Sequence, residues 1–83
     1  MQKDEAMKKV LEIIGPFAKN QEILKTASPE TKILEDLGVN SARLVDIILA
    51  FEDEFSIAVD DEAADKIRTI GDAVKMIVEK TAG

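Results

Sequence analysis

The apolar residues near the start of the chain recur at helical spacing. Across residues 3–14 they alternate in steps of three and four, which places one stripe of side chains on one face of a helix, at Met7, Val10, Leu11 and Ile14. This segment is therefore predicted to be an amphipathic helix. Two endings are open: Gly15 can stop the helix in a left-handed cap, or the helix can continue with a kink through Phe17 and Ala18.

A second stripe runs across residues 41–55. On a helical wheel with Leu44 at zero, the other apolar members lie within about 60° of it, and they are Ile47, Ile48, Phe51 and Phe55. The segment is predicted to be a helix that packs this face on the core. Residues 62–67 predict a short third helix capped by the acids at 60–62, with Val59 before it as a hydrophobic staple.

The last helix is predicted to begin at a variant capping box formed by Thr69 and Asp72. Its expected buried residues are Ile70, Ala73, Val74 and Ile77. Residues 19–40 show no clear period, but their scattered apolar side chains suggest a loop pinned onto the core, with a turn of helix after Pro29. We therefore predict an all-α fold: one domain over residues 1–83, a four-helix bundle with a short third helix and a long loop between helices 1 and 2.

Composition limits the function. The 83 residues include no Cys and no His, which excludes a Ser-His-Asp or Cys-His nucleophile and a disulfide framework. A self-contained enzyme is therefore not expected. The chain begins without the apolar segment of a secretory signal, and its apolar runs are too short to span a membrane. The expected location is the cytoplasm.

Charge is unevenly distributed around a net value of −6. Residues 35–65 contain ten acids and a single base, Arg43. This field repels nucleic-acid phosphates, so no nucleic-acid partner is expected. It suits either a solvated surface or a docking face for basic proteins, and charge alone favours the first. Asp60, Asp61, Glu62 and Asp65 lack the spacing of a calcium loop, so no metal site is predicted.

The start of the second long helix carries two good cap residues, Asn40 and Ser41. If Asn40 takes the cap, the Ser41 hydroxyl is free at the positive end of the helix, where a bound or attached phosphate is favoured. In the alternative, Ser41 is simply part of the cap, which is the ordinary role of a serine there. Arg43 is spaced to pair with Asp46, although a positive charge in a first turn is unfavourable.

A second apolar strip lies on the other side of this helix. Ala42, Val45 and Leu49 project at about 160°, 100° and 140° from Leu44. Acids border the strip at Asp46, Glu52 and Asp53. Such a surface is typical of a transient docking face. Alternatively, the third helix or the long loop covers it.

Three segments, in order, resemble the acyl carrier protein family. Residues 34–41 (Leu-Glu-Asp-Leu-Gly-Val-Asn-Ser) resemble the family's LxDLGxDS, residues 51–57 resemble LEEEFGI, and residues 70–74 resemble VGDAV. The resemblance implies an acyl-carrier four-helix fold in which a 4′-phosphopantetheine arm from coenzyme A is joined to Ser41. The arm's thiol carries acyl thioesters for fatty-acid, lipid or specialised acyl biosynthesis, and the chain itself is not an enzyme.

The resemblance also implies partners. They are a phosphopantetheinyl transferase and acyl-transferring or acyl-modifying enzymes whose basic surfaces dock a monomeric carrier. The implied docking residues are Asn40, Ala42, Val45, Asp46, Leu49, Glu52 and Asp53. The family usually has Asp-Ser-Leu where this chain has Asn40-Ser41-Ala42, and an acid is common at Arg43. These departures favour a specialised carrier with its own partners. Alternatives are an unmodified interaction or regulatory module, and a peptidyl or aminoacyl carrier.

Overall fold

The computed structural model describes residues 2–81, which form helices joined by one long and three shorter connections. The helices are α1 (Lys3–Ile14), a 3₁₀ turn (Gly15–Phe17), α2 (Gln21–Lys25), α3 (Ser41–Phe55), α4 (Asp61–Asp65) and α5 (Ile70–Thr81). Within residues 2–81 there is no strand, only an isolated bridge between Lys32 and Thr69. The predicted all-α bundle is confirmed, with α2 as an additional short helix.

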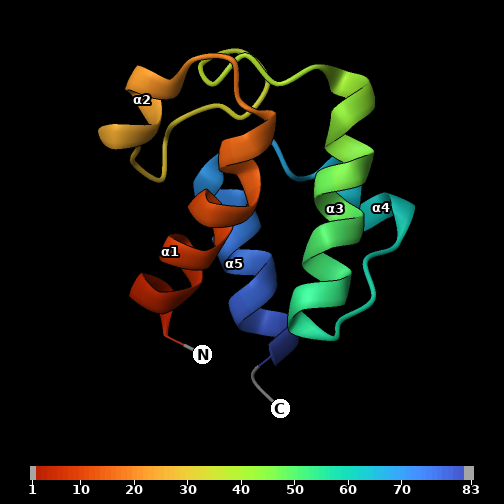
Figure 1. The fold of residues 1–83 in the computed structure, drawn as a ribbon. Helices are drawn as coiled ribbons and strands as arrows, with labels where there is room; N and C mark the ends of the chain where they lie inside the picture. The colour runs from red at the N-terminus through yellow and green to blue at the C-terminus, as the bar shows by residue number, and fades with distance from the viewer. Residues whose placement is uncertain (1, 82–83) are drawn as a thin grey trace.

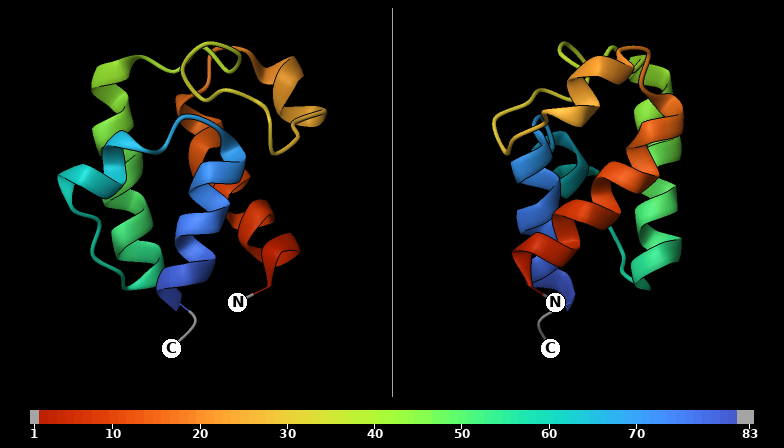
Figure 2. Two further views of the ribbon diagram at one scale, coloured as in Figure 1. Left: turned by 180° about the vertical axis from the view of Figure 1, so that it is seen from behind. Right: turned by 60° about the vertical axis from the view of Figure 1, so that its left-hand side comes forward.

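The three long helices form the body of the bundle (Figure 1). α1 runs in the direction opposite to α3 and α5, and it crosses them at a clear tilt (Figure 2). α2 and the long loop lie across the end of the bundle at which α3 begins (Figures 1 and 2). The first residue of α3, Ser41, is therefore at the same end as the long loop.

The core lies between α1, α3 and α5. α3 buries Ile47, Ile48 and Phe51, while Leu44 and Phe55 are half-buried against the core. α5 buries the four predicted residues and also Met76. On α1 the buried stripe is Ala6, Val10 and Ile14. The predicted stripe was thus wrong in part: Met7 and Leu11 are only half-buried, and the small Ala6 is fully buried in their place.

The end of α1 decides between the two predicted endings. Gly15 has right-handed helical angles (φ −44°, ψ −53°), so it does not form a left-handed cap. The chain instead tightens into the 3₁₀ turn, in which the N–H of Ala18 donates to the Gly15 carbonyl at 3.2 Å. Pro16 fits this turn because it stands at its start, where no helical N–H is required.

The long loop is joined to the segment before α5 by backbone hydrogen bonds. The Ile33 N–H donates to the Arg68 carbonyl at 3.0 Å, and the Ile70 N–H donates to the Thr31 carbonyl at 3.0 Å. The predicted pinning of the loop is confirmed. The predicted helical turn after Pro29 is present as one isolated turn and not as a helix: a tight turn closes first, with the Thr31 N–H donating to the Ser28 carbonyl at 3.0 Å, and the Asp36 N–H then donates to the Lys32 carbonyl at 3.0 Å.

At Gly71 the first turn of α5 lies close against this loop. The Gly71 N–H donates to the Pro29 carbonyl at 2.9 Å. A Cβ atom at position 71 would lie 2.9 Å from that same oxygen, which real Cβ atoms essentially never do. Glycine is therefore required here for space, not for its backbone angles. We call residues 29–33 and 68–71, with these hydrogen bonds, the loop seam.

The starts of α4 and α5 follow the predicted caps. The Asp60 carboxylate accepts from the Ala63 N–H at 2.7 Å, but α4 ends at Asp65 and not at the predicted residue 67. Ile67 leaves the helix and is buried in the core. At α5 the Thr69 hydroxyl accepts from the Asp72 N–H and the Asp72 carboxylate accepts from the Thr69 N–H, both at 3.1 Å. The predicted capping box is confirmed.

Candidate functional site

The start of α3 is capped by Asn40. Its side-chain oxygen accepts from the Ala42 N–H at 2.9 Å, and its carbonyl accepts from the Arg43 N–H at 2.8 Å. Ser41 is the first residue of the helix, its side chain is exposed, and within residues 2–81 its hydroxyl makes no hydrogen bond. The alternative in which Ser41 forms the cap is therefore wrong, and the hydroxyl is available at the helix's positive end.

The loop before α3 is held on both sides of a glycine. Leu37 and Val39 are buried, and Gly38 between them has φ 69°, the left-handed region that favours glycine. A Cβ atom at position 38 would lie 3.2 Å from the Lys19 Cβ. The backbone therefore turns tightly between two anchored side chains, and this fixes where Asn40 and the start of α3 lie.

The apolar strip of α3 is uncovered. Val45 is 59% exposed and Leu49 is 56% exposed, and Ala42 is also exposed. Neither α4 nor the long loop covers these side chains, so the alternative in which they are buried is wrong. The strip is open to a partner along the same helix that begins with Ser41.

The acids of α3 are mostly engaged within the chain. Asp46 pairs with Arg43 at 3.0 Å, as its spacing predicts. A Glu52 carboxylate oxygen accepts from the Val59 N–H at 3.1 Å, and Glu54 pairs with Lys9 at 3.8 Å. The last two contacts were not predicted, since they join α3 to the next loop and to α1 and leave no local signal. Asp53 is exposed and makes no such contact with the described residues.

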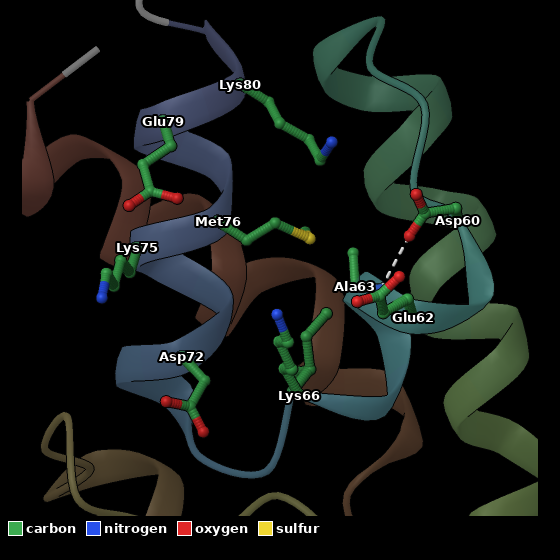
Figure 3. Close-up of a pocket in the computed structure, with 10 residues that line it drawn as sticks. Asp60, Glu62, Ala63, Lys66, Asp72, Lys75, Met76, Glu79 and Lys80 are labelled. Carbon is green, nitrogen blue, oxygen red and sulfur yellow. Dashed lines mark hydrogen bonds between the residues drawn. The ribbon is translucent and has the colours of Figure 1, made fainter.

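A separate hollow of about 690 Å³ lies between α4 and α5 (Figure 3). Met76 extends from α5 across it toward α4 (Figure 3). Its other lining residues are Asp60, Glu62, Ala63, Lys66, Ile67, Asp72, Lys75, Glu79 and Lys80. No residue of α3 lines the hollow, so it is distinct from the Ser41 end of the molecule. Within residues 2–81, no three His, Cys, Asp or Glu side chains are gathered as metal ligands.

The Asp72 carboxyl in the α5 capping box has a shifted pKa. Burial raises the pKa of Asp72, but hydrogen bonds from the Thr69 and Arg68 N–H groups, the Thr69 hydroxyl and the charge of Lys75 outweigh this effect. The pKa is therefore lowered from 3.8. This shift belongs to a structural cap and not to the start of α3.

Two comparisons decide the family. The family model described as "Phosphopantetheine attachment site" matches residues 8–77. An acyl carrier protein of Caulobacter vibrioides is 49% identical over 53 residues, which cover 64% of this chain and 68% of the relative. The chain belongs to the acyl carrier protein family.

Other members of the acyl carrier protein family extend the match to nearly the whole chain. A mitochondrial acyl carrier protein of Saccharomyces cerevisiae is 34% identical over 79 residues, which cover 93% of this chain and 63% of the relative. The solved structure of the Enterococcus faecalis acyl carrier protein superposes with a TM-score of 0.79 at 32% identity, covering 96% of this chain and 99% of that one. The acyl-carrier fold is thus confirmed by both sequence and structure.

Family membership establishes the coarse function. This chain is an acyl carrier protein that uses covalently attached 4′-phosphopantetheine. Its relatives are carriers, and the family works with acyl-handling enzymes and a phosphopantetheinyl transferase. None of the helices within residues 2–81 is both long enough and apolar enough to cross a membrane. The relatives include bacterial and mitochondrial proteins.

Proposed function

We propose that Ser41 is the attachment point of the 4′-phosphopantetheine arm. The observation that supports this is its exposed hydroxyl, which makes no hydrogen bond within residues 2–81 and stands at the first position of a 15-residue helix. A phosphodiester formed there lies at the positive end of the helix dipole. The Ser41 N–H also makes no hydrogen bond to the described residues, so it can donate to a phosphate oxygen.

In this proposal the chain positions a group and does not catalyse. The arm's terminal thiol supplies the chemistry, because it holds the acyl group as a thioester. Asn40 takes the cap and so leaves Ser41 free to react with the transferase's substrate. With no His and no Cys, the chain itself offers no imidazole base and no thiolate. The making and breaking of thioesters is therefore assigned to partner enzymes.

The proposed docking surface is the exposed side of α3. Its apolar part consists of Ala42, Val45 and Leu49, and its polar border consists of Asn40, Asp46, Glu52 and Asp53. The apolar side chains are open to solvent and can be desolvated by a partner, while the charged border orients the approach. Because the strip and Ser41 share one helix, a partner bound there has its active site beside the arm.

The test is the intact mass of the protein after incubation with coenzyme A and a broad-specificity phosphopantetheinyl transferase. We expect one added phosphopantetheine unit, which Ser41→Ala abolishes. Ser56→Gly is the matched control, because Ser56 is exposed at the other end of α3 and its φ of 53° suits glycine. That variant should be modified as fully as the wild type.

Two outcomes contradict the proposal. One is a wild-type protein that gains no mass, which favours the unmodified interaction module. The other is a Ser41→Ala protein that is still modified. A modified protein whose native thioester is an amino acid or peptide keeps Ser41 but makes the chain a peptidyl or aminoacyl carrier. The cytoplasmic location and the monomeric state stay predictions, the former because some relatives are mitochondrial.

A further inference from the structure

Arg43 is out of place by the rules of helix stability. It occupies the third position of α3, where the helix dipole favours an acid, and the first turn of α3 contains no acid. It is also the single base of the helix. Residues that break a local rule without an evident structural gain are found mostly at functional sites. We therefore look for the role of Arg43 in binding a partner and not in the stability of the helix.

Arg43 changes the charge of the docking surface near Ser41. Its side chain is 66% exposed, so it contributes no packing that would explain it. Its ion pair offsets the negative charge of Asp46, which is the acid nearest to Ser41 on this helix. An exposed pair of this kind contributes about 0.3–0.5 kcal/mol, which does not make it a structural requirement. On α3 the Ser41 end of the strip is thus close to neutral, and it presents an exposed guanidinium.

The other end of the strip is negative. Asp53 is exposed and pairs with no base among residues 2–81. Glu52 is next to it, and its carboxylate accepts from the Val59 N–H at 3.1 Å. Between the two ends lie the exposed Val45 and Leu49. Along α3 the order is therefore an exposed guanidinium held in an ion pair, then apolar side chains, then negative charge that is unpaired within residues 2–81.

We propose that this carrier docks to bipolar partner surfaces: an acidic group beside the partner's active-site entrance faces Arg43, an apolar patch faces Val45 and Leu49, and a basic group faces Asp53. The proposal rests on the proposed attachment at Ser41. A uniformly basic partner places like charge against Arg43, which disfavours its approach. A bipolar partner fits in one direction only, so the charge order also orients α3 and brings Ser41 to the entrance.

The test uses two forms of one phosphopantetheinyl transferase as the probe. One form has a basic docking surface, and in the other the basic residue nearest the entrance is replaced by Glu. The kcat/KM for modification is measured with the wild-type carrier and with Arg43→Glu. We expect Arg43→Glu to improve modification by the basic form about threefold to tenfold, and to impair modification by the acidic form by a similar factor.

The controls separate local charge from net charge and from folding. Lys25→Glu makes a similar charge change in another exposed i,i+3 pair, but on α2, away from α3 (Figure 1). It should change kcat/KM alike for both transferases. Arg43→Glu should fold well, because a Glu at this position has capping-box spacing from Asn40. At about 1 M salt, where screening acts within about 3 Å, the expected differences should disappear.

The outcomes are distinct. Opposite effects of Arg43→Glu on the two transferases support the bipolar surface. Equal effects on both, or the same pattern with Lys25→Glu, overturn it. If no variant is modified at Ser41 by either form, the proposed attachment site fails, and that result is separate because it does not depend on Arg43.

Discussion

The starts of α3 and α5 differ in how many of their polar groups are hydrogen-bonded within the chain. At α5 the Asp72 carboxylate accepts from both the Arg68 and Thr69 N–H groups at 3.1 Å. The Thr69 hydroxyl oxygen in turn accepts from the Asp72 N–H. The Gly71 N–H is also bonded, to Pro29. At α3 the Asn40 side chain satisfies one N–H, and the Ser41 side chain is left exposed.

If the arm is attached at Ser41 as proposed, this difference separates stability from function within one fold. Both helices begin with a residue that is favoured at caps, so the residue type alone does not distinguish them. The α5 start uses all of its polar groups internally and joins the loop to the bundle. The α3 start leaves a hydroxyl and a positive dipole end for an added group. Mutations at the two starts should therefore have different consequences.

The largest stability effect is expected from Gly71→Ala. Its new Cβ would lie 2.9 Å from the Pro29 carbonyl oxygen, which forces the loop seam apart. We expect a loss of about 1–3 kcal/mol in the free energy of unfolding, measured by urea denaturation. Gly15→Ala is the control, because Gly15 has helical angles and its new Cβ would be 4.0 Å from the nearest side-chain atom. That change should be neutral or stabilise by up to about 1 kcal/mol.

If Gly71→Ala is tolerated as well as Gly15→Ala, the loop seam is not closely packed, and the loop does not hold the start of α5 as tightly as the structure indicates. A Gly71→Ala protein that is destabilised but is still modified at Ser41 when folded would sharpen the comparison, because it would show that the seam serves stability.

Next in size is Asp72→Ala, which removes a carboxylate that accepts two N–H groups. We expect a loss of about 1–2 kcal/mol at neutral pH. The pKa of Asp72 is lowered in the folded state, so the ionised form stabilises the fold above its ordinary value of 3.8. This contribution is lost as the pH falls through the lowered folded value. The difference between wild type and variant should therefore shrink when unfolding is measured at pH values below 3.8.

A stability difference that stays constant from neutral to strongly acidic pH would contradict this role of the charge. Asp72→Asn separates the contribution of the hydrogen bonds from that of the charge, since it keeps an oxygen acceptor and loses the ionisable group. It should cost less than Asp72→Ala and should show no acid-dependent loss at this position.

The smallest effect is expected from Asn40→Ala. One cap hydrogen bond is lost, at an exposed site, so the free energy of unfolding should fall by about 1 kcal/mol or less. Modification should slow as well, because the first turn that carries Ser41 loses its cap. The measurements are urea denaturation and the rate of mass gain. A normal rate of modification in a destabilised Asn40→Ala protein would indicate that the cap does not position Ser41.

The sequence predicts the long helices because their apolar period persists over three or more turns. α3 matches its expected bounds and α5 its expected start, and the α5 capping box is a local signal that needs no tertiary information. α2 was missed because five residues form little more than one turn, too few for a period to be visible. The predicted α1 stripe left out Ala6, because this weakly hydrophobic residue gives little signal in the sequence although it is fully buried.

The site was only partly predictable for a similar reason. The spacing of Asn40 and Ser41 left two caps open, and the backbone geometry of the start of α3 decides between them. Exposure of Val45 and Leu49 depends on where α4 and the loop pack, which no pattern within α3 contains. The Lys9–Glu54 pair joins two helices that are distant in sequence and has no local signature.

The loop seam also determines which parts of the molecule can open separately. Its hydrogen bonds run between backbone groups, so residues 29–33 gain protection from the first turn of α5 and not from neighbouring helices in the chain. Local unfolding of the loop must therefore break bonds at α5 at the same time, which makes the two segments one cooperative unit. The first turn of α3 lies outside the seam, but the Val39 N–H donates to the carbonyl of the seam residue Ile33 at 3.4 Å, so the seam also holds the segment that leads into Ser41.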